Sequence, residues 1–467
     1  MLFPRQICHR LKYILSISAQ RSFYSTPTVS NAFNSSLYFS SSEDVYSVLL
    51  PAFDRSYIQS VAENLESIRQ SLRLRGIDSG DIDLEEMRSS LLQFAELNVT
   101  IEKIKKKRNK LLGKKRKTSS TTDDDGSKIT ANELLNKQHD QLKESLLQAR
   151  TSFYQVEKVV VPFLLKIPAP IREDMTDSVQ VIDRYEGSAT AFKGQQQQFP
   201  VINYIRLGYM NNIYHSSIVG PDAQYLVGEG AQAFHGLVQL LADHFEAAQY
   251  VPICGLDIVK SAVVEAVDDK AVAEDHFTIR DRDCDDVGQQ HHLVGEASLE
   301  AFCGWLVKTP PGNPVVSTRR YLQLGSHYGR SFSQTHAVRC TVLSDAQGSD
   351  RSMEQLYGHW WQALTAGLGL RCQSLRVDVG SLRAGEHAKY QLAVWLHSTG
   401  EYVPVGEVTH YASYLSTRIG LVEHQNRHIL SSAVDVLQLL KCIFEHYQDP
   451  STGKILYPQS LREYFFV

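Results

Sequence analysis

A hydrophobic seam between residues 84 and 163 is the feature that most constrains the fold of this 467-residue chain. Apolar side chains recur there at alternating steps of four and three, the heptad pattern of a coiled coil, with a one-residue slip after Phe94. The stretch 119–127 between the two halves has no apolar residue and is typical of a turn. The sequence therefore predicts two long helices folded into an antiparallel hairpin, here called the arm. The seam positions are Leu84, Met87, Leu91, Phe94, Leu97, Ile101, Ile104, Arg108 and Leu111, then Leu135, His139, Leu142, Leu146, Ala149, Phe153, Val156, Val160 and Phe163.

Ten basic residues lie on the arm between Glu102 and Lys117, and only Glu102 opposes them there. Most charged runs are solvated helix faces, but cations on a rod can also bind the phosphates of a polyanion. Asp123–Asp125 follow and partly neutralise this end of the arm. Because the whole chain has a net charge of −4, any affinity for nucleic acid must come from such a local patch. The predicted nucleic-acid-binding residues are Lys103, Lys105, Lys106, Lys107, Arg108, Lys110, Lys114, Lys115, Arg116 and Lys117.

The composition, 43% hydrophobic and 21% charged, is that of an ordinary soluble globular protein. No apolar run reaches the roughly 20 residues that a helix needs to cross a bilayer, so no membrane span is predicted. The seven cysteines include no C-x-x-C pair, which argues against a zinc knuckle or a disulfide framework. Carboxylates alternate over 281–286, but the Gly and Glu that a calcium loop requires are missing. No metal site is predicted.

The N-terminal segment resembles a targeting sequence. The first 42 residues contain no Asp or Glu, carry scattered Arg and Lys, and are rich in Ser and apolar residues. Residues 21–25 resemble a matrix-peptidase cleavage site. We interpret 1–30 as a mitochondrial presequence, which predicts a location in the mitochondrion, in the matrix. The alternative is an N-terminus that is merely unstructured.

The remaining chain predicts an α+β protein, because helical and extended patterns alternate irregularly and the strands favour an antiparallel sheet. Helices are predicted over 58–74, 231–248, 351–365 and 432–447, and strands over 321–324, 337–343, 375–379 and 390–396. Gly76 suits the position just after a helix, while Pro162, Pro168 and Pro170 are predicted to end the second arm helix. The predicted parts are the presequence 1–30, a helical segment with the arm at 45–170, and a body at 171–467.

Several short motifs, in a fixed order over residues 45–467, resemble seryl-tRNA synthetases, which are class II aminoacyl-tRNA synthetases. Residues 68–76 are similar to the family's segment before the arm, and 107–111 to its Arg-Asn-Lys stretch. Residues 225–231 resemble the start of the class II motif 1 helix, and Pro252 falls at the motif's dimer-interface proline. Residues 388–395 and 445–448 resemble a family strand and the end of motif 3. The resemblance implies a coiled-coil arm followed by an antiparallel sheet flanked by helices.

The same resemblance implies a degenerate catalytic site. Ser298 and Pro404 stand where the family has glutamates that contact serine. Gly329 and Gln438 replace arginines that grip the α- and γ-phosphates of ATP, and Ser331 replaces the motif 2 glutamate. Since losing one preorganised charge contact typically costs about 3 kcal/mol in the transition state, losing four is predicted to abolish ATP binding and serine activation. No cofactor is therefore predicted.

The chain thus resembles the catalytically inactive, mitochondrial seryl-tRNA-synthetase-like paralogues of insects. We predict a protein that binds tRNA, serine tRNA in particular, without aminoacylating it. One alternative is a scaffold or regulatory partner, as a homodimer or as a heterodimer with the genuine mitochondrial seryl-tRNA synthetase. Another is a divergent active ligase, because a shifted register would bring Arg330, one residue away, to the motif 2 position. Of a later family segment only Arg418 persists.

Overall fold

The structure is a computed structural model, which describes the following residues: 35–38, 51, 53–77, 84–118, 125–187, 201–216, 224–268, 277–279, 290–307, 318–329, 334–421, 427–449 and 451–465. At 114–118, 125–135, 215–216 and 224 only the backbone is described. The predicted presequence, the acidic stretch 281–286, Arg330 and Ser331 lie outside the described residues.

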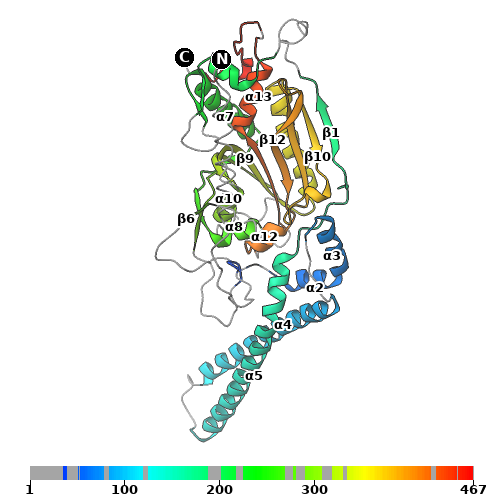
Figure 1. The fold of residues 1–467 in the computed structure, drawn as a ribbon. Helices are drawn as coiled ribbons and strands as arrows, with labels where there is room; N and C mark the ends of the chain where they lie inside the picture. The colour runs from blue at the N-terminus through cyan, green and yellow to red at the C-terminus, as the bar shows by residue number, and fades with distance from the viewer. Residues whose placement is uncertain are drawn as a thin grey trace, which may run out of the picture. The chain divides into compact units, whose positions relative to one another are not determined.

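An eight-stranded sheet forms the centre of the body (Figure 1). The strand order is β1-β10-β11-β12-β13-β9-β8-β4, and all neighbours are antiparallel except β4 and β8. The predicted α+β class with an antiparallel sheet is therefore confirmed. The strands are β1 Gln180–Tyr185, β4 Val251–Pro252, β8 Arg319–Tyr328, β9 Gln334–Asp345, β10 Cys372–Arg376, β11 Ala388–Leu396, β12 Glu401–His410 and β13 Arg427–Asp435.

One face of this sheet is covered by helices α7 (Glu229–Ala247), α11 (Ser349–Gln362) and α13 (Val436–His446). Phe245, Trp360 and Phe444 are fully buried there, and the Trp360 indole N–H donates to Ser432 Oγ at 2.7 Å. The other described elements are α6 Tyr204–Met210, β2 Tyr214–Ser216, β3 Gln224–Leu226, β5 Ile258–Lys260, α8 Ser261–Val267, β6 Phe277–Ile279, β7 His291–Leu293, α10 Leu299–Leu306, α12 Tyr414–Arg418 and α14 Gln459–Arg462. Among the described residues, no helix has the length and apolar character needed to cross a membrane.

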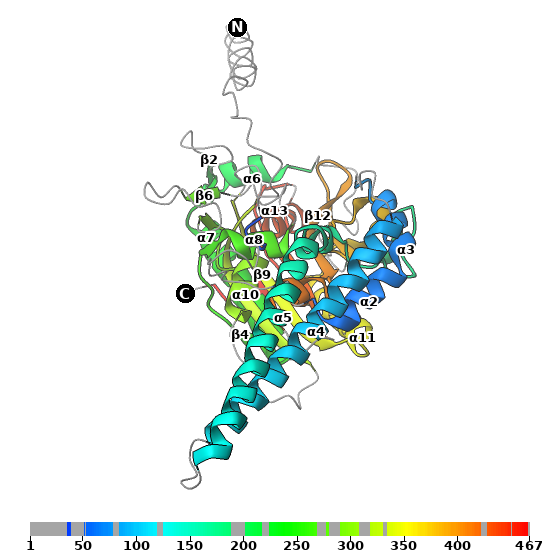
Figure 2. The ribbon, with the colours of Figure 1, turned by 90° about the horizontal axis from the view of Figure 1, so that it is seen from below.

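The predicted arm is confirmed as two long helices, α4 (Leu84–Thr118) and α5 (Asp125–Lys166), which lie side by side (Figures 1 and 2). Leu91, Ile101, Leu146 and Val160 are buried along the seam. The Phe94 and Phe153 rings stack across it with centroids 4.8 Å apart. Every predicted seam position with a described side chain is buried or half-buried.

Two predicted limits of the arm helices are wrong. Residues 125–127 form the first helical turn of α5 and do not belong to the connecting loop. The negative charge of Asp125 at the helix N-terminus is stabilised by the positive end of the helix dipole. Pro162 lies inside α5 and does not end it. The buried neighbours on both sides, Val161 and Phe163, hold this turn in place despite the missing N–H. The helix ends at Lys166, before Pro168.

Three other predicted elements have different limits. The helix predicted over 58–74 is two helices, α2 (Arg55–Glu63) and α3 (Leu65–Leu74), separated at Asn64. Gly76 has φ +67°, and the N–H groups of Gly76 and Ile77 donate to Arg73 O and Leu72 O, which is a Schellman motif. Strand β10 covers 372–376, not 375–379. Residues 432–435 belong to β13, and α13 begins only where the Asp435 side chain caps it.

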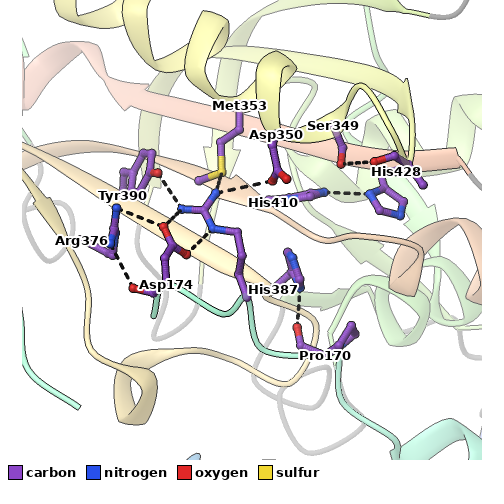
Figure 3. A network of polar contacts seen from close by, with 12 residues as sticks. Pro170, Asp174, Ser349, Asp350, Met353, Arg376, His387, Tyr390, His410 and His428 are labelled. Atoms are coloured by element: carbon purple, nitrogen blue, oxygen red, sulfur yellow. Dashed lines mark hydrogen bonds and ion pairs between the residues drawn. The ribbon is translucent and has the colours of Figure 1, made fainter. Parts of the chain in front are cut away.

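A buried and a half-buried arginine join the base of the arm to the body. Arg418 donates to Leu165 O of α5 at 2.6 Å and to Glu265 O and Ala266 O of α8 at 2.6 and 3.0 Å. The guanidinium of Arg172, just after α5, bonds the Asp174 carboxylate and the Tyr390 hydroxyl on β11 (Figure 3). The junction is therefore fixed by polar contacts as well as by apolar packing.

Candidate nucleic-acid interface and pocket

A stripe of four lysines runs along the side of α4 that faces away from α5. Lys103, Lys106, Lys107 and Lys110 are spaced by three and four residues, so they share one face of the helix, and all four are exposed. Among the described residues, none of them forms an ion pair. The stripe rises about 10 Å along the helix axis. We call these four residues the lysine stripe.

The other predicted basic residues of the arm have different surroundings. Lys105 pairs with Glu102 at 2.8 Å, and this hydrogen bond holds the pKa of the Glu102 carboxyl below its usual value. Arg108 is half-buried in the seam beside Ile104, and its Nε has no hydrogen-bond partner among the described residues. Lys114–Lys117 lie on the α4 backbone, but their side chains are outside the description. The structure thus places four of the ten predicted residues on one outward surface.

Polar side chains line the sheet face opposite α7, α11 and α13, here called the polar face. Successive side chains alternate between the two faces of a strand, and the register sets neighbours side by side. Gln323, Arg339 and Ala433 are neighbours across β8, β9 and β13, and Glu407 on β12 continues the row. Lys389 on β11 pairs with Thr409 in the next row. The polar face therefore carries both charges and hydrogen-bonding groups.

A pocket of 240 Å³ lies at this face, between the sheet, α10 and the loop 382–386. Its charged lining residues are Arg339, Arg383, Glu300, Glu386, Glu407 and Asp268. Neither Glu300 nor Glu407 was identified from the sequence as a site residue. Among the described residues, no group of three or more His, Cys, Asp or Glu side chains is arranged to hold a metal ion.

Several charged groups of the pocket already contact other protein groups. Lys389 Nζ lies 2.5 Å from Glu407 Oε2 and 3.3 Å from Glu386 Oε1. Burial alone would raise the pKa of Glu407, but the Lys389 ammonium, with smaller contributions from Arg383 and Arg339, outweighs burial, so the net pKa is below the usual value. Arg339 donates to Ala297 O at 2.7 Å and to Ser431 Oγ at 2.9 Å. A ligand in this pocket would have to compete with these contacts.

The predicted degenerate positions are distributed around and away from this pocket. Ser298 is fully buried, and its hydroxyl accepts from Ala301 N as the cap of α10. Gln438 is half-buried in the first turn of α13, where its N–H donates to Asp435. Gly329 is half-buried directly after β8. Pro404 is exposed and pairs with Ala393, outside the pocket.

Carboxylates lie close to two of these positions in sequence. Glu300 is two residues after Ser298, and Glu407 is three residues after Pro404. On β12 the register slips where Leu392 pairs with Gly406 and Ala393 with Pro404, which leaves Val405 unpaired. This bulge keeps Pro404 and Glu407 on the same face despite their odd separation. A count from the sequence motif alone cannot include such a bulge, so Glu407 is missed.

The Glu407–Lys389 pair predicts how stability changes with pH. The Glu407 carboxyl has a lowered pKa in the folded chain, so its contribution is complete above about pH 5 and is lost as the pH falls through that lowered pKa. We expect the stability advantage of the native chain over Glu407→Gln to shrink between pH 5 and pH 3. Urea unfolding of both chains at the two pH values measures it. An advantage that is the same at both values would show that the pair does not lower this pKa.

Known structures share this fold. No protein-family model matches the chain. The cytoplasmic serine-tRNA ligase of Naegleria fowleri, solved with AMP, matches 89% of this chain and 97% of its own length, with a TM-score of 0.65 at 16% identity. The M. kandleri seryl-tRNA synthetase, solved with A. aeolicus tRNASec, matches 71% of this chain and 69% of its own length, with a TM-score of 0.50 at 11% identity. The chain therefore has the fold of the class II seryl-tRNA synthetases.

Curated sequences give the same result. Over 458 residues the chain is 22% identical to the serine–tRNA ligase of Haloarcula marismortui, covering 87% of this chain and 94% of that protein. Over 383 residues it is 21% identical to the serine–tRNA synthetase-like protein Slimp of Drosophila melanogaster, covering 77% of this chain and 76% of that protein. The resemblance that the motifs predict is confirmed. One of these proteins is named a ligase and the other only synthetase-like.

Proposed function

We propose that this chain is a non-catalytic, seryl-tRNA-synthetase-like protein of the mitochondrial matrix that binds tRNA, serine tRNA in particular, without aminoacylating it. The observation that carries the proposal is the lysine stripe. Four exposed ammonium groups without ion-pair partners among the described residues offer about 10 Å of positive surface. When such a surface binds RNA, it releases the counterions of the RNA phosphates, and this release contributes to affinity. The solved M. kandleri synthetase with tRNASec shows that this fold can carry tRNA.

The pocket supports the absence of catalysis. Its 240 Å³ is smaller than the roughly 300–1,000 Å³ of most small-molecule sites. Among the described residues, Arg339 already donates to two protein oxygens and Arg383 faces Asp268 at 4.0 Å. The described residues of the pocket therefore do not fit ATP, whose triphosphate needs cations that are free to bind it. The mitochondrial location rests on the acid-free, basic N-terminal sequence.

The test is binding of the full chain to serine tRNA over a series of salt concentrations. Affinity is expected to fall steeply between 50 and 200 mM salt, because each phosphate contact contributes about −0.9 to the slope of log K against log salt. Affinity that does not change with salt, or no binding, would contradict the proposal.

An edge of the sheet favours a second candidate function, that of a partner subunit. Val251 beside Pro252 on edge strand β4 is 56% exposed, Leu256 is 76% exposed and Ile258 is 47% exposed. Such a set of exposed aliphatic side chains is typical of a protein interface. The occupant would be a second copy of this chain or the genuine mitochondrial seryl-tRNA synthetase.

Replacing Leu256 by Asp tests this surface with little risk to folding, since the side chain is already exposed. The variant is expected to weaken self-association or association with the synthetase about tenfold, because a charge would be buried at the interface. Sedimentation velocity of the chain, alone and mixed with the active enzyme, measures it. The matched control is Leu147→Asp on the arm, which is 66% exposed and should change nothing. Monomers under both conditions would rule out the partner function.

A further inference from the structure

A cluster of two arginines and two aromatic residues lies on the polar face, at the end of the sheet away from the pocket. It consists of Arg184 on β1, Arg371 just before β10, Trp395 on β11 and Tyr402 on β12. We call it the arginine–aromatic cluster. Neither the arm nor the pocket includes any of these residues.

The strand register brings the four residues together. Trp395 pairs with Tyr402, and the Trp395 N–H donates to Arg371 O at 2.8 Å. Arg184 pairs with Gln373, the second residue after Arg371. Because Lys389 and Trp395 are six residues apart on one strand, they share a face and lie about 20 Å apart. Lys389 contacts Glu386 and Glu407 of the pocket, so the cluster is distant from it.

The arginines are held against the rings. The Arg371 guanidinium carbon lies 4.2 Å from the centroid of the Trp395 ring and 5.9 Å from that of Tyr402. The Arg184 guanidinium lies 5.7 Å from the Tyr402 ring, and the two rings meet edge to face at 5.0 Å. Stacked guanidinium groups of this kind lose little freedom on binding a ligand, because the rings already fix them.

The cluster is not part of the hydrophobic core. Trp395 and Tyr402 are half-buried, but neither packs against the core under α7, α11 and α13. Arg371 keeps 32% of its side chain exposed and pairs with the exposed Glu186 at 3.1 Å. Arg184 is exposed, bonds Gln373 at 3.1 Å, and has no ion-pair partner among the described residues. A positive, ring-lined surface thus faces solvent on a sheet.

We propose that the arginine–aromatic cluster is a second RNA-binding surface, which takes unpaired nucleotides. Bases stack on the guanidinium–ring layers, and phosphates bind the exposed N–H groups of Arg184 and Arg371. Single-stranded RNA is commonly bound in this way, by aromatic side chains and arginine planes on the face of a β-sheet. The proposal does not depend on the lysine stripe, since the two surfaces use different elements.

The chemistry favours RNA over an acidic peptide. An acidic peptide would use the two guanidinium groups and leave the ring stack without a role. A nucleotide carries both a phosphate for the arginines and a flat base for the stack. Both kinds of contact therefore point to the same ligand.

The experiment measures binding of a fluorescein-labelled ten-nucleotide oligouridine to the full chain by fluorescence anisotropy. Arg371→Ala and Trp395→Leu are each expected to weaken binding about tenfold, within the usual cost of losing one stacked base. Trp395→Phe keeps a ring and should bind within about threefold of the native chain, but it should lose the quenching of tryptophan fluorescence by the RNA. Arg351→Ala, at an exposed arginine on α11, is the matched control and should bind normally.

Two further variants complete the experiment. Replacing the four lysines of the lysine stripe by Glu should not change the quenching of tryptophan fluorescence by oligouridine. A loss of tRNA binding at the arm can therefore be distinguished from a loss of RNA binding at the cluster. If Trp395→Leu unfolds, the Arg184→Ala/Arg371→Ala pair decides the matter by its loss of affinity. No binding by the native chain, unchanged binding by the variants, or displacement of the RNA by an equimolar decaglutamate would each overturn the proposal.

Discussion

Replacing Lys103, Lys106, Lys107 and Lys110 together by Glu is expected to weaken binding to serine tRNA about a hundredfold at physiological salt. The four ammonium groups are exposed on one face of α4 and lack ion-pair partners among the described residues, so they are free to neutralise phosphates. The variant should also flatten the salt dependence, by about 3 to 4 in the slope of log K against log salt. Filter binding at several salt concentrations measures both effects.

A matched control separates this local effect from total charge. Arg73, Arg351, Lys454 and Arg462 are exposed cations away from the lysine stripe, and their joint replacement by Glu changes the net charge by the same amount. That control is expected to retain most of the affinity. Equal losses in both variants would show that the stripe is not the interface. Unchanged binding of the stripe variant would show the same.

Replacing Arg418 by Met is expected to cost about 3–5 kcal/mol of unfolding free energy. Arg418 is 4% exposed, and its guanidinium donates to carbonyl oxygens of α5 and α8 and lies 4.8 Å from the Tyr414 ring. Methionine fills a similar volume but leaves three buried carbonyls without donors. Urea unfolding followed by circular dichroism measures the loss.

The control for this prediction is Arg351→Met, at an arginine that is exposed on α11. Surface changes of this kind usually alter stability by less than about 0.5 kcal/mol. A loss of the same small size for Arg418→Met would contradict the joining role of Arg418.

The arm could be predicted from the sequence because its information is local. A heptad pattern of apolar residues predicts both the helix and its buried face. Phe94 and Phe153, two of its positions, stack across the seam. Spacing of three and four likewise places Lys103, Lys107 and Lys110 on one side. The errors fall at helix limits, as at Pro162, where packing on both sides outweighs a local signal.

The pocket could not be predicted in the same way, because it depends on register between strands that are distant in sequence. Glu407 reaches the polar face only through the bulge at Val405, and its partner Lys389 comes from the neighbouring strand. The structural role of Arg418 could not be predicted from the sequence either. Arg418 persists from a family segment, yet in this chain it donates to backbone carbonyls.

Serine-dependent exchange of pyrophosphate into ATP measures whether this chain activates serine. The full chain is assayed with serine, ATP and serine tRNA, beside a genuine seryl-tRNA synthetase, after the same preparation has been shown to bind the tRNA. For a non-catalytic, tRNA-binding chain we expect tRNA binding with no exchange above that of a protein-free sample. Exchange that requires serine would contradict it and identify the chain as a divergent active ligase.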